Sequence, residues 1–233
     1  MKLRGERQCT DCGARWSYYE TGEITCPDCG SVRSVGVGER AEHTDSPVEL
    51  DLQPAIEQID VEPLSTVADT AAEQARRYLH RTGFVDAGRL KPFGNDYLLA
   101  AELRRVGATL SRSMRISDAE ELYFFSLLRG GTDGERPPPE EVPDSLRAER
   151  GLAVAAAVAA YVSDMRRVQE DPEATVSEVL SAVRSNRKRI EALDGDVDPA
   201  EAERLVRAVR DVSRYLREDD ETALLQAGDR FDS

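Results

Sequence analysis

The sequence lacks any long hydrophobic run. Its longest apolar stretch, residues 152–162, is rich in alanine and falls well short of the roughly 20 residues that a membrane-spanning helix requires. Residues 1–6 lead directly into polar sequence and do not resemble a secretory signal. We therefore expect a soluble, cytoplasmic protein with no membrane partner.

Histidine is nearly absent, and so are the motifs of common enzyme classes. Only His43 and His80 occur, too few for a histidine metal site, and no Walker loop, GxGxxG loop, nucleophile elbow or HExxH motif is present. The carboxylate runs at 120–121 and 219–221 have no histidine or lysine beside them, which favours solvated faces or helix caps over acid–base pairs. We predict no catalytic residue and a protein that is not an enzyme. The alternative is an enzyme with an unrecognised site in the helical region.

Lysine is scarce as well. Only three of the 31 basic residues are lysine, and 45 acidic residues give a net charge of -14. A bias towards arginine and acid resembles the proteins of salt-loving archaea, so the acidity alone says little about partners. Residues 1–36 contain five basic and five acidic side chains, whereas residues 39–63 contain eight acidic and one basic. The N-terminal segment is therefore the least acidic part of the chain.

All the cysteines lie in one short segment, as two CxxC pairs. Two residues between the paired cysteines allow both sulfurs of a pair to reach one metal ion, and thirteen residues between the pairs are enough for a hairpin. We predict one structural Zn²⁺ in a closed site that leaves no position for a substrate. Iron and disulfides are the alternatives, and disulfides are disfavoured inside cells. The predicted ligands are Cys9, Cys12, Cys26 and Cys29.

Residues 1–37 are predicted to form a small β-type zinc ribbon. Alternation predicts a strand over 14–19, a return at 24–25 and a third strand within 31–37. Glycine follows each CxxC pair, which suits a tight turn around the metal.

Four side chains of the ribbon are predicted as an interaction surface. Trp16 and Tyr18 share one face of the predicted strand, where they would either stack on bases or cover the metal site. Arg15 and Arg33 would either contact phosphate or remain solvated. We expect another protein as the partner, with nucleic acid as the alternative.

The residues around the cysteines carry a family resemblance. The segments CTDCG at 9–13 and CPDCGS at 26–31 resemble a transcription factor IIB-type zinc ribbon, and the whole chain is similar to an uncharacterised family of haloarchaeal zinc-ribbon proteins. Transcription factor IIB follows its ribbon with cyclin-like repeats, and no such duplication occurs here. The resemblance therefore implies four zinc ligands and the alternative of a transcription-related, nucleic-acid-binding factor. It does not carry over the role in polymerase recruitment.

The rest of the chain is predicted to be helical. Residues 38–63, acidic and with three prolines, are predicted to be a linker. Apolar residues at spacings of three and four over 64–233 then predict a bundle of about six helices without a convincing strand. Capping boxes are predicted at 117–120 and 175–178, an N-cap at Asn95, and a helix end at 130–131. We thus predict a mainly α protein: zinc ribbon 1–37, acidic linker 38–63 and helical bundle 64–233, acting as a non-enzymatic adaptor or regulator.

Overall fold

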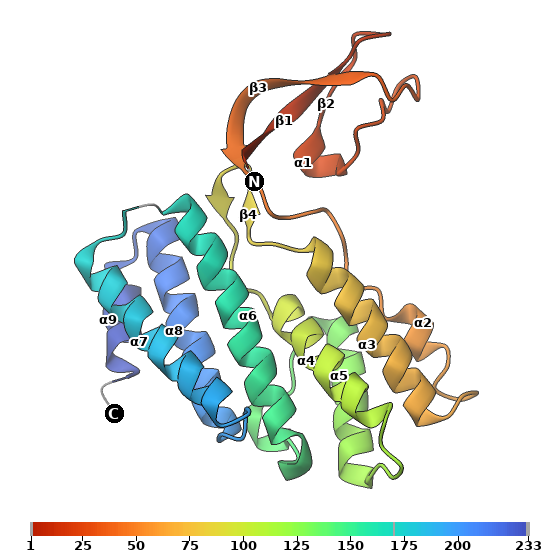
Figure 1. Ribbon diagram of the computed structural model, residues 1–233, viewed down its shortest axis with the longest axis vertical. Helices are drawn as coiled ribbons and strands as arrows, with labels where there is room; N and C mark the ends of the chain where they lie inside the picture. The colour runs from red at the N-terminus through yellow and green to blue at the C-terminus, as the bar shows by residue number, and fades with distance from the viewer. Residues whose placement is uncertain (1, 170, 232–233) are drawn as a thin grey trace.

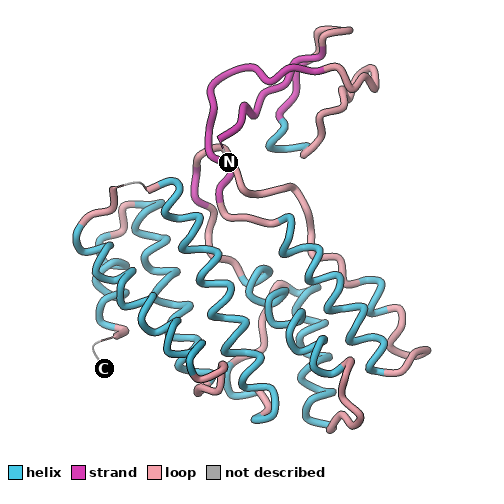
Figure 2. The backbone as a smooth tube through the Cα atoms, viewed as in Figure 1, coloured by secondary structure: helices cyan, strands magenta, loops and turns pink. Residues whose placement is uncertain are grey.

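The computed structural model describes residues 2–169 and 171–231. The structure is mainly α-helical with a small N-terminal antiparallel sheet (Figure 1). This architecture confirms the predicted fold class. The sheet and its flanking loops stand apart from a row of helices (Figure 2). None of the helices in the described residues is long and apolar enough to cross a membrane. The N-terminal elements are β1 (Lys2–Cys9), β2 (Arg15–Ser17), α1 (Tyr18–Thr21), β3 (Ser34–Glu42) and α2 (Gln53–Ile56); the following ones are α3 (Leu64–Arg81), β4 (Val85–Asp86), β5 (Arg89–Leu90), α4 (Asn95–Leu110), α5 (Asp118–Asp133), α6 (Arg147–Val168), α7 (Ala174–Ala192), α8 (Pro199–Glu218) and α9 (Glu221–Asp229).

The ribbon sheet has the strand order β2-β1-β3, so the first strand of the chain lies in the middle. This strand was not predicted, because its polar residues show no alternation and it is held by pairing on both sides. The predicted return strand at 24–25 is wrong, because β1 and not residues 24–25 pairs with β2. The predicted strand over 14–19 ends at Ser17, whose side chain accepts a hydrogen bond from Glu20 N and begins helix α1. Tyr18 therefore leaves the strand face that carries Trp16.

A joint between the ribbon and the bundle follows directly after β3. Thr44 Oγ1 donates a hydrogen bond of 2.5 Å to Asp164 Oδ2 on α6, and the same carboxylate oxygen accepts from Phe84 N at 2.9 Å. Asp45 pairs with Lys91 in the same region. His43, which is buried, lies with its ring centroid 4.5 Å from that of Tyr19. These contacts fix the ribbon to one end of α6.

The segment 38–63, predicted as a linker, has its own structure. Its first residues extend β3 to Glu42, beyond the predicted ribbon boundary at 37. Farther on, Gln53–Ile56 form α2, and Leu52 and Ala55 are buried against the bundle. The apolar side chains of this acidic segment are what anchor it, because their burial removes them from water.

Two apolar clusters make up the core of the bundle. One is built mainly from α6, α7, α8 and α9, and the other from α2, α3, α4 and α5. Helix α4 contributes to both, since Leu98 belongs to the first cluster and Leu99 to the second. Figure 1 shows α4 beside α6, between the two groups of helices. The row of helices is therefore held together through α4 and α6.

The predicted helix ends are only partly correct. The capping box at Ser117 and Glu120 is present. The box at 175–178 is wrong because α7 already begins at Ala174. Asn95 is the first residue of α4 rather than its N-cap, and its side chain bonds to Gly134 O and to Arg210. Helix α5 continues through the predicted stop at 130–131 to its left-handed C-cap at Gly134.

A short hairpin interrupts the helical region, where no strand was predicted. Strands β4 and β5 pair Val85 with Leu90 and Asp86 with Arg89. Gly88, with a φ of 79°, lies in the turn between them. Two residues per strand are too few for a periodic signal in the sequence.

Helices α3 and α4 approach each other closely at Gly107. A Cβ at this position would lie 2.5 Å from the carbonyl oxygen of Ala68. Alanine normally stabilises a helix interior by about 0.5–1 kcal/mol relative to glycine, but here we expect Gly107→Ala to destabilise by about 1–3 kcal/mol through overpacking. Urea unfolding measures the change. Gly228→Ala in α9, where a Cβ meets nothing within 4 Å, is the control and should be neutral or stabilising; stabilisation by both substitutions would contradict the close packing.

Candidate metal centre

The four cysteine sulfurs converge at the tip of the ribbon. Cys9 Sγ and Cys29 Sγ are 3.7 Å apart, and Cys12 Sγ and Cys26 Sγ are 3.6 Å apart. All four sulfurs lie within 4.8 Å of one another. A tetrahedral site with metal–sulfur bonds of about 2.3 Å has sulfur–sulfur edges of about 3.8 Å. The donor set and its spacing therefore fit a single metal ion, and all four cysteines are free thiols in the structure.

The two CxxC segments have the same backbone geometry. Gly13 N donates to Cys9 O at 3.1 Å, and Gly30 N donates to Cys26 O at 2.9 Å. These glycines adopt φ values of 79° and 71°, which a residue with a Cβ rarely takes. The equivalence extends one residue further, since Cys9 N donates to Ala14 O and Cys26 N to Ser31 O. The glycine after each pair thus closes a turn that presents two sulfurs to the same point.

The electrostatics of the thiols favour a cation among them. The backbone N–H of Cys12 is the main cause that lowers the pKa of Cys9 to about 7. At Cys12 the N–H of Ala14 acts in the same direction, but the side chains of Cys29 and Cys26 outweigh it and the pKa rises to about 12. Four neighbouring thiolates repel one another unless a positive charge lies between them, and a bound metal ion supplies that charge.

Polar contacts tie the two CxxC segments together. Asp11 accepts a hydrogen bond of 2.6 Å from Ser31 Oγ and forms an ion pair of 3.4 Å with Arg33. Thr10 N donates to Arg33 O at 3.0 Å. These residues belong to opposite segments, so the sulfurs are held in position from outside the cluster as well.

The predicted interaction surface is divided by the fold. Trp16 is only 9% exposed, packs with Cys9 and Cys26, and donates from Nε1 to Glu23 O at 2.9 Å. This burial supports the interpretation that Trp16 covers the metal site. Tyr18 lies in α1, with its ring centroid 6.4 Å from that of His43 near the joint. Arg15 and Arg33 remain exposed.

The ribbon and the bundle together match one protein family. The model of the family of unknown function DUF7117 covers residues 1–231. The chain belongs to this family. No curated protein and no solved structure matches the chain. The match includes both the ribbon and the helices of this chain.

One polar cluster of this DUF7117 chain has no counterpart in the sequence predictions. Arg150 of α6 forms an ion pair with Glu102 of α4 at 2.8 Å and donates to Tyr123 Oη at 3.1 Å. Arg136 pairs with the same carboxylate at 3.1 Å and with Glu203 of α8 at 3.1 Å. The side chains of Arg150 and Glu102 are almost completely buried. This network joins α4, α5, α6 and α8 across the core.

A second missed feature is a surface groove rich in arginine. Its residues come from α3, α4, the turn after α4 and α6, and five of them are arginine. Two Arg-Arg pairs, at 76–77 and 104–105, were a visible signal in the sequence. Periodicity alone assigns such pairs to a solvated helix face. Only the structure shows that α3 and α4 bring the two pairs to the same groove.

Proposed function

We propose that this protein is a non-enzymatic adaptor whose zinc-stabilised ribbon contacts another protein. Zinc is the metal that best suits four thiolates in a tetrahedral arrangement. With all four positions taken by cysteine, the metal has no place for a water molecule or substrate, so its role is to fold the ribbon. The specific contacts of the adaptor then come from the surface of the ribbon.

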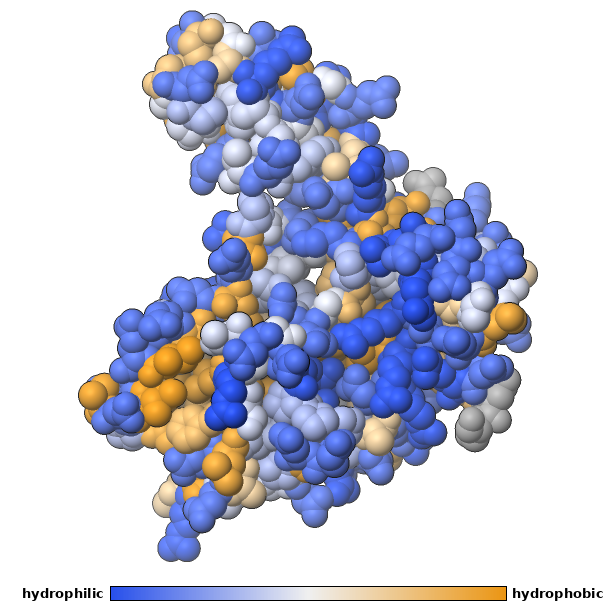
Figure 3. Space-filling view, turned by 180° about the vertical axis from the view of Figure 1, so that it is seen from behind, coloured by the Kyte–Doolittle hydropathy of each residue, from blue (hydrophilic) through white to orange (hydrophobic). Residues whose placement is uncertain are grey.

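The observation that carries this proposal is the exposure of apolar side chains on the ribbon. Val32 is 69% exposed, Val35 50% and Ile24 49%. Val35 and Arg15 both lie opposite Gln8 in the sheet, so they share one face. Figure 3 shows hydrophobic side chains at the far tip of the ribbon. Exposed valine and isoleucine on so small a module favour a protein partner, because apolar contact at an interface removes them from water.

A capture experiment with a matched pair of variants tests the proposal. The tagged chain is used to recover partners from native extract, with nuclease treatment in one arm to remove nucleic-acid bridges. We expect Val32→Ser plus Val35→Ser to weaken recovery of the ribbon-dependent partner about tenfold. Both valines are surface residues, so the zinc content of the variant should equal that of the wild type.

Val61→Ser is the control, because Val61 is 75% exposed but lies outside the ribbon. The control should recover the partner at the wild-type level. Equal recovery of every partner by the ribbon variant and the control would contradict a ribbon contact. Loss of every partner on nuclease treatment would favour the alternative of a nucleic-acid-binding factor.

A further inference from the structure

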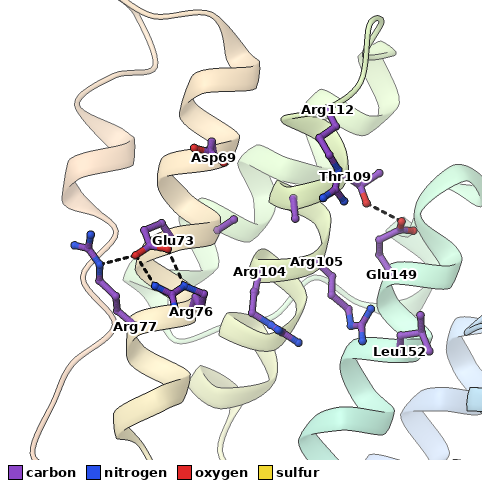
Figure 4. A pocket seen from close by; sticks show the side chains of 12 residues that line it. Asp69, Glu73, Arg76, Arg77, Arg104, Arg105, Thr109, Arg112, Glu149 and Leu152 are labelled. Carbon is purple, nitrogen blue, oxygen red and sulfur yellow. Dashed lines mark hydrogen bonds and ion pairs between the residues drawn. The ribbon is translucent and has the colours of Figure 1, made fainter.

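The arginine-rich groove is a cavity of about 720 Å³ on the side of the bundle, away from the metal centre. It lies across α3, α4 and α6, and Figure 4 shows its side chains reaching from all three helices. A cavity of this size is within the range of small-molecule sites. We call it the arginine groove after Arg76, Arg77, Arg104, Arg105 and Arg112.

The groove is shaped by small residues where α3 and α4 meet. Ala72 and Ala108 line it, and the contact of Gly107 with Ala68 brings the two backbones close together. Long arginine side chains at the neighbouring positions then extend around this shallow floor. The groove therefore combines an apolar base with a cationic border.

Its own carboxylates neutralise only part of the positive charge. Glu73 binds Arg76 at 2.8 and 2.9 Å and Arg77 at 2.9 Å, and these two arginines lower the pKa of Glu73 to about 2. Glu149 accepts a hydrogen bond of 2.9 Å from Thr109. With five arginines and three carboxylates in its lining, the groove has a formal charge of +2 in a chain whose net charge is -14.

Three of the arginines form no ion pair in the described residues, although the charge of Glu149 acts on Arg105. These three are Arg104, Arg105 and Arg112. The Nε atoms of Arg104 and Arg105 are also buried without a hydrogen-bond acceptor. Burial and the adjacent charge of Arg104 lower the pKa of Arg105. Buried donors without acceptors are unfavourable. An anion in the groove would be held by the guanidinium groups of the arginines that line it.

We propose that the arginine groove binds a small phosphorylated ligand, such as a phosphomonoester or a diphosphate of up to nucleotide size. A phosphate dianion matches the formal charge of +2, and the fork of a guanidinium fits two phosphate oxygens at once. A nucleic acid strand is a poorer match, because binding it requires a long series of phosphate contacts and the surrounding molecule is strongly acidic.

Isothermal titration calorimetry on the full, zinc-loaded chain tests this site. Sodium pyrophosphate and ADP are titrated at constant ionic strength, in the salt at which circular dichroism shows the chain folded. We expect saturable binding with one site per chain for at least one of these ligands. Arg105→Gln and Arg112→Gln should each weaken it about tenfold or more, as expected for loss of one charge-assisted hydrogen bond.

Arg129→Gln is the matched control, because Arg129 of α5 is exposed and does not line the groove; its affinity should be unchanged. Arg112 is likewise exposed, so its variant decides the question even where Arg105→Gln fails to fold. Absence of saturable binding, or equal affinity of the groove variants and the wild type, overturns the proposal. So does citrate that binds as tightly as pyrophosphate, or a single-stranded DNA 12-mer that binds more tightly than ADP. None of these outcomes bears on the ribbon.

Discussion

Replacing Cys26 and Cys29 by serine is expected to unfold the ribbon, residues 2–42, and to leave the helical bundle folded. The apparent binding free energy of a structural zinc ion is about 10–16 kcal/mol in small zinc modules, far more than this ribbon gains from its core of Cys9, Trp16 and Cys26. Without the metal, nothing of similar magnitude holds the two CxxC segments together. The bundle has its own two apolar clusters and does not depend on the site.

Trp16 makes this result easy to measure. It is the only tryptophan in the chain and is buried beside two of the cysteines, so its fluorescence should shift to the red when the ribbon unfolds. The helical signal at 222 nm should remain nearly constant. Ser31→Ala is the control, since it removes the hydrogen bonds of Ser31 Oγ to Asp11 and from Arg33 N but none of the four cysteines. Unchanged Trp16 emission in the double cysteine variant would contradict metal-dependent folding of the ribbon.

Arg150→Met is expected to lower the free energy of unfolding by about 3–5 kcal/mol. The side chain of Arg150 is 1% exposed, and its contacts include Glu102 at 2.8 Å and Pro137 O at 3.1 Å. Burial disfavours the charge of Arg150, but Glu102 and Tyr123 outweigh this effect and raise its pKa. Methionine fills a similar volume but leaves the buried carboxylate of Glu102 with less compensation, and breaking a buried pair on one side has this cost.

Denaturant unfolding of a double-mutant cycle checks the explanation. Arg150→Met combined with Glu102→Leu should recover part of the lost stability, because the uncompensated carboxylate is then gone. Arg147→Met is the matched control on the same helix: Arg147 is 37% exposed and pairs with the solvated Asp144, so we expect a loss below about 1 kcal/mol. Equal losses for Arg147→Met and Arg150→Met would show that burial of the network does not matter for stability.

The sequence was most informative where the structure depends on neighbouring residues. The CxxC spacing predicted that the four cysteines would meet, because each pair needs only a local turn closed by Gly13 or Gly30. The capping box at Ser117 was equally local, since its partner Glu120 is three residues away. Helical periodicity likewise indicated most of the helices between residues 64 and 233, although it placed several of their ends incorrectly.

Contacts between distant residues were not accessible in this way. The residues next to Glu102 in the sequence do not show whether this side chain of α4 is buried or exposed to solvent. Its partners Tyr123, Arg136 and Arg150 are 21, 34 and 48 residues away. The ribbon joint depends on Thr44 and Asp164, which are 120 residues apart. Strand β1 is central only because β2 and β3 fold against it. Such features arise from the packing of the whole chain.

The metal centre is tested most directly by metal analysis and X-ray absorption spectroscopy of the purified full chain. We predict one zinc ion per chain, surrounded by four sulfur atoms at about 2.3 Å, and no bound zinc in Cys26→Ser plus Cys29→Ser. Stoichiometric iron with visible charge-transfer bands would assign the site to a different metal. Two disulfides with no bound metal would contradict the structural zinc and, with it, the zinc-stabilised ribbon as the basis of the proposed function.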